Sequence, residues 1–269
     1  MIRVAINGAA GRMGRRLVDL VSHEQGMKLV AAFEQPGHPD LGRDAGELCG
    51  CGKLGVSLAS DWTAPADVLI DFSLPAAAAA RAAEAAGKGV ALVIGTTGLT
   101  IAQKAAVAAA AKKVPVLHSP NMSVGVNLLF RLAAEVAAAL GEEYDIEIIE
   151  AHHRFKKDAP SGTALRIAEE IAAATGRNLA KAVVYGRHGA SAERKPGEIG
   201  IHAVRAGDIV GDHTVIFSGL GERVEVVHRA ESRDTFVRGA IRAARFLVGK
   251  KPGMYAMGDV LGGHMAAHS

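Results

Sequence analysis

The stretch Ile2-Arg-Val-Ala-Ile-Asn-Gly-Ala-Ala-Gly-Arg-Met-Gly14 decides the fold. Its first six residues form a short β-branched run typical of a strand, and Arg15–Val21 has the spacing of an amphipathic helix. A strand, a glycine-rich turn and a helix in succession indicate a dinucleotide-binding unit, because glycine permits a tight turn and a close approach of the backbone to a pyrophosphate. The spacing is G-x-x-G-x-x-G, with Ala10 in place of the middle glycine of G-x-G-x-x-G, so the motif alone is moderately specific.

The second predicted strand, Met27–Glu34, supports that interpretation. Glu34 stands at its carboxyl end, 20 residues beyond Gly14 by subtraction. An acidic side chain there can accept hydrogen bonds from the adenosine ribose hydroxyls, and it would repel a phosphate on that ribose. The next residue, Gln35, is neutral, so the sequence favours NADH. Arg12 could still reach a 2′-phosphate, and NADPH stays open.

Strands and helices alternate as far as residue 119. The predicted strands are 67–73, 89–94 and 114–119, the predicted helices are 75–86 and 100–113, and 35–64 is a glycine-rich excursion with one short strand at 56–58. This alternation predicts an α/β fold with a Rossmann-like doubly wound parallel sheet. Ligands bind at the carboxyl ends of such strands, where Gly8–Gly14, Gly95–Gly98 and Ser119–Ser123 fall. Asn121 offers an amide to a nicotinamide carboxamide or to the substrate.

The pattern changes after the predicted helix 124–140. Strands are predicted at 144–152, 182–186, 198–206, 213–218 and 222–230, with one helix, 163–175, among them. They predict an α+β domain with an open, mixed, largely antiparallel sheet, whose free face would pair with a copy of itself in a homo-oligomer. A last helix, 236–248, returns to the first domain. We therefore expect a dinucleotide-binding domain at 1–123, completed by 234–269, and a substrate-binding and oligomerisation domain at 124–233.

Composition narrows the class of protein. The chain has 269 residues, of which 49% are hydrophobic and 22% charged, as in an ordinary soluble globular protein. Its net charge of +3 is too small to argue for nucleic acid. No apolar run is expected to span a membrane and no signal-peptide pattern is found, so a cytoplasmic enzyme is expected. The two cysteines, Cys49 and Cys51, suit neither a disulfide framework nor a zinc site, and no metal is predicted.

A second motif, Glu150-Ala-His-His-Arg-Phe-Lys-Lys-Asp-Ala-Pro-Ser-Gly-Thr-Ala164, joins a predicted strand to a predicted helix. The helix starts at Ser161-Gly-Thr163, and a helix start attracts anions through its backbone N–H groups and its dipole. Cations surround it, and histidines can donate protons near neutral pH. The motif predicts a pocket for an anionic substrate, with a solvated basic loop as the alternative.

These motifs together resemble the family of 4-hydroxy-tetrahydrodipicolinate reductase, which is also called dihydrodipicolinate reductase. The resemblance runs in order through Ile6–Gly14, Val93–Gly98, Asn121–Asn127, Glu150–Thr163 and Arg205–Gly211. The His-His-x-x-Lys-x-Asp-Ala-Pro-Ser-Gly-Thr element is its most specific part. The resemblance implies a homotetramer that reduces a small dicarboxylate ring with NADH or NADPH in the diaminopimelate branch of lysine synthesis.

The resemblance also implies roles for individual residues. His152 would donate the proton, Lys156 would be its partner at the reacting ring, His153 would contact substrate, and Ser161, Gly162 and Thr163 would hold a carboxylate. The cofactor would be bound by Gly8, Ala9, Ala10, Gly11, Arg12, Met13, Glu34, Gly95, Thr96, Thr97, Ser119, Pro120, Asn121 and Met122. Many members carry a cation after the acidic residue of the second strand, and Gln35 departs from that pattern. By chemistry alone, Lys157 is as good a candidate as Lys156.

Three other functions fit parts of the sequence. Another NAD(P)-dependent amino-acid dehydrogenase would share the first domain and should lack the His-His-x-x-Lys element. A non-catalytic dinucleotide-binding sensor would tolerate loss of His152 and Lys156. A dehydratase coupled to the preceding synthase would remove the substrate hydroxyl, and the sequence leaves open whether that loss is catalysed here.

Overall fold

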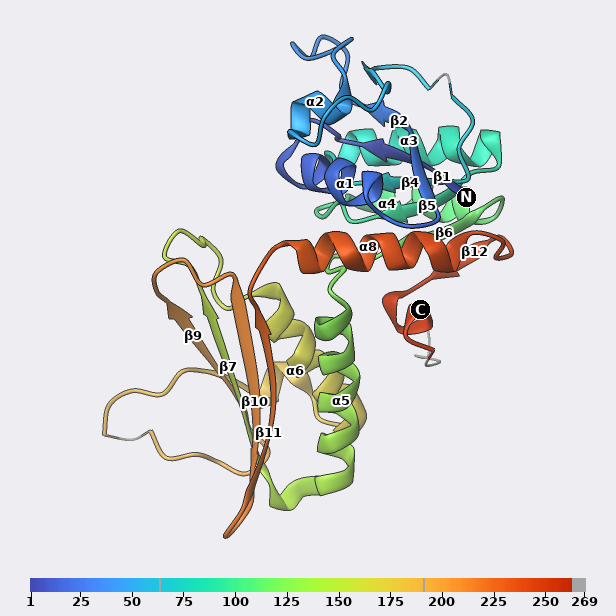
Figure 1. The fold of residues 1–269 in the computed structure, drawn as a ribbon. Coiled ribbons are helices and arrows are strands. Elements are labelled where there is room, and N and C mark those ends of the chain that lie inside the picture. The colour runs from blue at the N-terminus through green and yellow to red at the C-terminus, as the bar shows by residue number, and fades with distance from the viewer. Residues whose placement is uncertain (63, 191, 263–269) are drawn as a thin grey trace. The chain divides into compact units, whose positions relative to one another are not determined.

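A computed structural model describes residues 1–62, 64–190 and 192–262 of the chain (Figure 1). The chain divides into two compact units. The first comprises Met1–Val124 and the chain from Asp234 onward, and the second comprises Gly125–Arg233.

The first unit is built on a seven-stranded parallel sheet. The strands are β1 (Ile2–Asn7), β2 (Met27–Phe33), β3 (Leu58–Ala59), β4 (Val68–Asp71), β5 (Ala91–Ile94), β6 (Pro115–His118) and β12 (Gly253–Tyr255). Their order is β12-β6-β5-β4-β1-β2-β3, so the chain reverses its direction of winding at β1. This is the order of a Rossmann-like doubly wound sheet, and the predicted fold class is confirmed.

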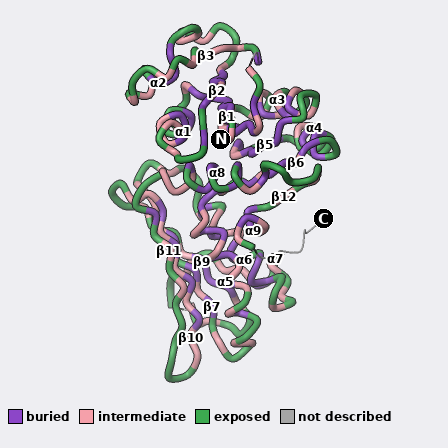
Figure 2. Tube along the Cα trace, turned by 45° about the vertical axis from the view of Figure 1, so that its right-hand side comes forward, coloured by how far each residue is buried: buried purple, intermediate pink, exposed green. Residues whose placement is uncertain are grey.

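Helices cover both faces of this sheet. α1 (Arg12–Ser22) and α8 (Asp234–Leu247) pack on the face that carries Val4 and Ile6 of β1. α3 (Pro75–Lys88) and α4 (Ile101–Ala111) pack on the opposite face, where Ala5 points. Because both faces are covered, β4 and β5 are buried along their length and β1 is buried from Val4 onward; Figure 2 colours buried residues purple.

The excursion between β2 and β4 is held by one side chain. Asp44 caps α2 (Ala45–Cys49), and its carboxylate accepts hydrogen bonds from the backbone of Gly46, Glu47, Leu54 and Gly55. Cys49 and Cys51 are half-buried free thiols with their sulfurs 3.1 Å apart. The short strand predicted at 56–58 lies at Leu58–Ala59 instead, and α2, β12 and α9 (Met257–Val260) were not predicted, since each has too few residues for a period to show.

The second unit contains a five-stranded sheet with helices on one face (Figure 1). In the order β11-β10-β7-β9-β8, these strands are Arg223–Ala230, Gly211–Ser218, Asp145–His152, Ile199–Arg205 and Val183–Tyr185. The helices are α5 (Val124–Leu140), η1 (Gly141–Glu143), α6 (Gly162–Thr175) and α7 (Leu179–Ala182).

The open, mixed character of this sheet is confirmed, but the expectation of largely antiparallel pairing is wrong. β10 pairs antiparallel with β7 and β11, whereas β9 pairs parallel with β7 and β8. The physical reason is the crossover through α6 and α7, which returns the chain so that β8 runs in the direction of β7.

α5 contradicts the expectation that no apolar run is long enough to span a membrane. Together with η1 it forms a helical run, Val124–Glu143, that is long and apolar enough to cross a membrane by length and composition alone. Its Leu129, Phe130 and Ala133 are buried in the core of the second unit, against the sheet and α6. It is therefore a core helix.

Candidate active site

Three loops of the first unit leave its sheet from aligned positions. Asn7, the last residue of β1, is in register with Asp71 of β4, Asp71 with Ile94 of β5, and Ile94 with His118 of β6. The loops that follow β1, β5 and β6 therefore begin along one edge. They are the loops in which the sequence places the cofactor residues.

The glycine-rich turn after β1 depends on the absence of side chains. Gly8 has φ +77°, and a Cβ there would lie 2.5 Å from the carbonyl oxygen of Phe72. A Cβ on Gly14 would lie 2.0 Å from the carbonyl oxygen of Gly8, so only glycine lets α1 pack against the turn. The N-cap of α1 is Gly11, which has no side chain to bind the amides of the first turn. This turn and helix start fit the pyrophosphate of a dinucleotide.

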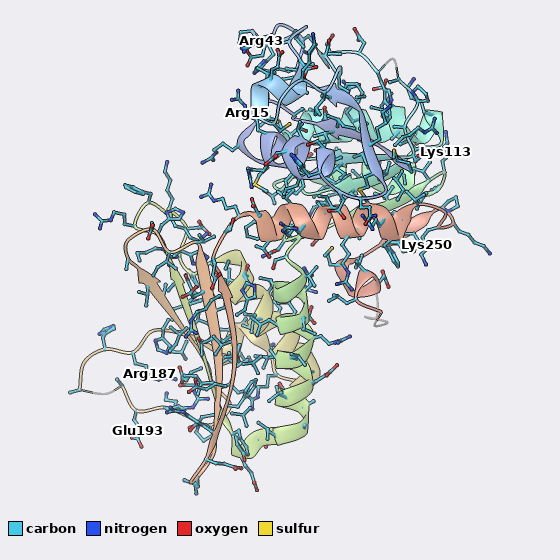
Figure 3. The ribbon with its side chains drawn as sticks, viewed as in Figure 1. Arg15, Arg43, Lys113, Arg187, Glu193 and Lys250 are labelled. Atoms are coloured by element: carbon cyan, nitrogen blue, oxygen red, sulfur yellow. The ribbon has the colours of Figure 1, made fainter. Side chains whose placement is uncertain are left out.

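Glu34 folds back onto the glycine-rich turn. Its carboxylate accepts hydrogen bonds from the backbone N–H of Ala10 at 3.3 Å and of Gln35 at 3.1 Å. Arg15 of α1 donates to the carbonyl oxygen of Ala10 and also lies 3.7 Å from the carboxylate of Asp40 (Figure 3 labels Arg15). Arg12 is exposed. The carboxylate of Glu34 thus lies beside the glycine-rich turn.

A buried carboxyl group, Asp71, organises two of the three loops. It accepts hydrogen bonds from Thr96 Oγ1 at 2.5 Å, from Asn7 Nδ2 at 2.5 Å and from Ser73. Burial raises the pKa of Asp71, although these hydrogen bonds oppose the shift. The hydroxyl of Thr96 is therefore used in hydrogen bonds within the protein, whereas the neighbouring Thr97 is exposed and can contact a ligand. Sequence reasoning did not single out Asp71.

The loop after β6 is held by its own polar groups. Ser119 Oγ donates to the carbonyl oxygen of Asn121 at 2.7 Å, and Asn121 Oδ1 accepts from the backbone N–H of Ser123 at 2.9 Å. Met122 is buried in the core of the unit. Of this predicted group, Pro120 is exposed, and Met122 can offer a ligand only its backbone.

The second unit carries the other predicted residues around the end of β7. Its last residue is His152, whose Nδ1 lies 2.6 Å from Glu150 Oε2. Glu150 is fully buried and also accepts two hydrogen bonds of 2.8 Å from Arg205 of β9. A Cβ on Gly211 of β10 would lie 3.0 Å from His152 Nε2, so a side chain at this position would crowd that nitrogen.

The start of α6 lies against the same carboxylate. The backbone N–H of Ser161 donates to Glu150 Oε1 at 3.0 Å, and Ser161 Oγ accepts from the N–H of Ala164 as the helix cap. Ser161 Oγ also lies 3.0 Å from Nε2 of the buried His213 of β10. The Ser161 hydroxyl is thus engaged within the protein. Gly162 and Thr163 form the first turn of the helix, which is the place for an anion.

Lys156 and His153 lie in the loop between β7 and α6. The ammonium group of Lys156 donates to both carboxylate oxygens of Asp158, at 2.9 and 2.8 Å, which leaves a third N–H. Nδ1 of His153 is buried and has no hydrogen-bond partner in the part of the chain that the structure describes. Lys157 is exposed. The unsatisfied imidazole nitrogen fits a polar ligand at this loop.

Opposing charges set the protonation of this cluster. Burial lowers the pKa of His152, the adjacent Glu150 opposes that shift, and the positive charges of Lys156 and Arg205 add to it. Burial and the neighbouring His152 and His228 lower the pKa of His213 to about 3. Burial raises the pKa of Glu150, but hydrogen bonds from Arg205, His152 and Ser161 outweigh it and leave the pKa below its usual value. Glu150 is therefore ionised at neutral pH, and His213 is neutral.

Sequence comparison assigns both halves of the chain. The family model described as dihydrodipicolinate reductase, N-terminus, matches residues 2–122, and the one described as dihydrodipicolinate reductase, C-terminus, matches residues 125–261. The chain belongs to the dihydrodipicolinate reductase family.

Similar members of the dihydrodipicolinate reductase family cover almost the whole chain. A 4-hydroxy-tetrahydrodipicolinate reductase of Anaeromyxobacter sp. (strain Fw109-5) is 54% identical over 97% of this chain and 98% of its own. One from Magnetococcus marinus is 53% identical over the same shares. Among solved structures, a dipicolinate-bound dihydrodipicolinate reductase from Paenisporosarcina sp. TG-14 has a TM-score of 0.75 at 27% identity and covers 95% of this chain and 97% of that chain.

In this member of the dihydrodipicolinate reductase family, the structure adds three residues to the predicted set: Glu150, Arg205 and His213. Glu150 follows Ile146 and Ile148 at a spacing of two, and His213 precedes Val215 and Phe217 in the same way. A polar residue in step with buried apolar residues of a strand points into the core and needs a partner there. That signal was readable in the sequence.

Proposed function

We propose that this chain is a 4-hydroxy-tetrahydrodipicolinate reductase, an NAD(P)H-dependent oxidoreductase of lysine and diaminopimelate biosynthesis that yields tetrahydrodipicolinate. The observation that carries the proposal is the cluster at the end of β7. A buried carboxylate there bonds both His152 and the backbone at the start of α6. Relatives about half identical over nearly the whole chain bear that name.

The reaction adds a hydride and a proton to an unsaturated ring. When bound, the nicotinamide cofactor supplies the hydride. We propose that His152 delivers the proton, which contributes roughly 10²–10⁴ in rate, and that Lys156 stabilises the negative charge that develops on the ring. The first turn of α6, with Gly162 and Thr163, binds one carboxylate, and His153 with its unpartnered Nδ1 contacts the substrate.

The cofactor proposed is NADH in preference to NADPH. Glu34 presents a carboxylate beside the turn at Ala10, where it accepts hydrogen bonds from ribose hydroxyls and repels a 2′-phosphate. Gln35 supplies no cation to offset that repulsion. The remaining contacts come from the three loops at the edge of the sheet.

We further propose that residues 1–123 and 234–269 form the dinucleotide-binding domain, and that 124–233 bind substrate and assemble a cytoplasmic homotetramer. The face of the second sheet opposite α5 and α6 carries exposed apolar side chains on three of its strands. Val204 of β9, Ile149 of β7 and Val227 of β11 are 44%, 36% and 42% exposed. Ile149 and Val227 flank Thr214 in register, so they share this face.

The test is turnover. We expect the purified protein to oxidise NADH when freshly generated 4-hydroxy-tetrahydrodipicolinate is added, and to do so more slowly with NADPH at equal concentration. Pyridine-2,6-dicarboxylate, a planar analogue of the ring, should inhibit competitively and lie at Ser161–Thr163 in crystals. If neither NADH nor NADPH is oxidised, the proposal is wrong, and a non-catalytic dinucleotide-binding sensor becomes the favoured function.

A further inference from the structure

Glu150 is a buried carboxylate with an unusually complete set of hydrogen-bond donors. Both Nη atoms of Arg205, the backbone N–H of Ser161 and Nδ1 of His152 lie between 2.6 and 3.0 Å from its oxygens. A buried charge is tolerated only where it is paired and hydrogen-bonded, and here the two-pronged contact with Arg205 supplies the opposite charge. Glu150 is therefore held in one orientation.

The contact with His152 determines which nitrogen of that ring faces away. An ionised carboxylate only accepts hydrogen bonds, so Nδ1 must carry a proton in both the neutral and the charged ring. The proton that the ring can release is then the one on Nε2, on the side where Gly211 has no Cβ. The side chain of His152 is 12% exposed, so the surrounding protein limits its rotation.

We propose that Glu150 is a positioning residue for the reaction, acting through His152. It fixes the His152 ring with Nδ1 protonated, so that Nε2 is the proton-donating atom. Its negative charge also favours the protonated ring, which the positive charges of Lys156 and Arg205 disfavour. The proposal rests on the proposed function, because it needs His152 to be the proton donor. After transfer, the neutral ring already has the tautomer that Glu150 binds, so no ring flip is needed.

The charges that face His152 come from each element packed around it. They are Glu150 of β7, Arg205 of β9, His213 of β10 with His228 of β11 beside it, and Lys156, with its partner Asp158, of the loop before α6. Glu150 and Asp158 are the acidic groups in this set, and Glu150 is the one in direct contact. Loss of its charge would leave the ring among cations, which disfavour protonation.

The same carboxylate also binds the N–H of Ser161, the N-cap of α6. The proposed proton donor and the proposed carboxylate seat are thus both attached to Glu150. Relaxation of this group should move the donor relative to the substrate, and a small displacement of a catalytic group has a large effect on rate. We therefore expect kcat to change more than KM.

The experiment is the pH profile of kcat/KM for Glu150→Gln. We expect a fall of roughly tenfold at pH 8 that becomes smaller at pH 6, because the high-pH limb moves to lower pH when the donor loses its proton earlier. An equal fall at all pH values would mean that Glu150 is merely structural and would overturn the proposal. A profile that coincides with that of the wild type would overturn it as well.

The chain provides a matched control in Glu147→Gln. Glu147 lies on the same strand, contacts His202 Nε2 at 2.6 Å and pairs with Arg187 and Arg194 (Figure 3 labels Arg187). It resembles Glu150 in its histidine and arginine partners, and among the described residues it forms no hydrogen bond or ion pair with His152 or α6. Glu147 lies on the face of β7 that carries Ile149, so the mass of its variant is checked by light scattering, and the assembled variant should keep the wild-type pH profile.

A second measurement needs no turnover. Nitrogen NMR of the imidazoles in the ligand-free protein should show neutral His152 with its proton on Nδ1 in the wild type, and a mixture of tautomers in Glu150→Gln. If the wild type turns over no substrate, the proposed function fails, while the tautomer still reports on Glu150. If neutral His152 in the wild type carries its proton on Nε2, the positioning role is wrong even when the enzyme is active.

Glu150→Gln strips the half-buried Arg205 of its partner charge, which is destabilising. Should that variant not fold, Arg205→Lys keeps a cation but loses the two-pronged contact that orients Glu150. We expect its high-pH limb to move in the same direction by a smaller amount. A limb that stays in place in a folded Arg205→Lys protein would then overturn the proposal.

Discussion

The imidazole rings of His152 and His213 meet edge to face, with centroids 5.2 Å apart. His213 is buried beneath Ser161, whereas His152 contacts an ionised carboxylate. Protons on both rings would repel each other in a partly desolvated site. Because His213 stays neutral at pH 7, His152 is the ring of this pair that can take up a second proton and become positively charged.

His213 should make the protein sensitive to acid. Its pKa falls from 6.5 in the unfolded chain to about 3 in the folded one. Below pH 6.5 the unfolded chain binds a proton that the folded chain does not, so the free energy of unfolding drops by about 2 kcal/mol between pH 7 and pH 5. Urea unfolding at the two pH values measures this. We expect His213→Gln to reduce the difference, and an unchanged difference would assign the acid sensitivity to other groups.

The proposed roles of His152 and Lys156 can be tested by substitution. His152→Gln should lower kcat by roughly 10²–10⁴, because the ring would lose its acid catalyst. Lys156→Ala should also lower kcat strongly, with the Kd of the cofactor almost unchanged in both. Lys157→Ala is the matched control, since Lys157 is exposed beside Lys156. Full activity in His152→Gln would remove it from the donor role.

Glu34 should determine the choice of cofactor. Glu34→Gln removes a charged acceptor for ribose hydroxyls, so the Kd of NADH should rise by about tenfold or more. The Kd of NADPH should fall, because the repulsion of the 2′-phosphate is removed. Titration by quenching of protein fluorescence measures both constants. Gln35→Arg should tighten NADPH alone, and equal affinities for the two cofactors in the wild type would contradict the proposed preference.

α8 returns the chain to the first unit, and there the backbone of Gly239 lies close to the backbone of Met122. A Cβ on this residue of α8 would lie 1.7 Å from the carbonyl oxygen of Met122. Gly239→Ala should therefore lower the free energy of unfolding by about 1–3 kcal/mol, visible as a lower Tm. Gly87→Ala in α3 is the control, because a Cβ there meets nothing within 4 Å. We expect that change to stabilise slightly.

The free face of the second sheet should carry the tetramer contacts. Light scattering should give the mass of four chains, and Val227→Asp should reduce it, because a charge would be buried at the interface. Val224 of the same strand is opposite the core residue Phe217 and so faces the helices. Val224→Asp should leave the assembly intact. A monomeric wild type would contradict the proposed homotetramer.

The sequence predicted both fold types because their signals are local. Alternation of strands and helices, glycines after β1 and the acidic residue after β2 each lie within a few turns of chain, and α5 was predicted at Val124–Leu140 as observed. The mixed character of the second sheet was predicted, but its share of parallel pairs was underestimated. It depends on how a crossover returns the chain, and no residue pattern records that direction.

In the candidate site, too, local features could be predicted from the sequence and long-range contacts could not. The residue types suited to proton donation and to anion binding are contiguous between Glu150 and Thr163, so the sequence alone determined which chemistry is proposed for this chain. Tertiary structure decided which partners tune that chemistry. Arg205 and His213 reach Glu150 and Ser161 from other strands, 55 and 52 residues away. Burial and charge act through space, so the protonation of His152 follows from neighbours that only the folded chain brings together.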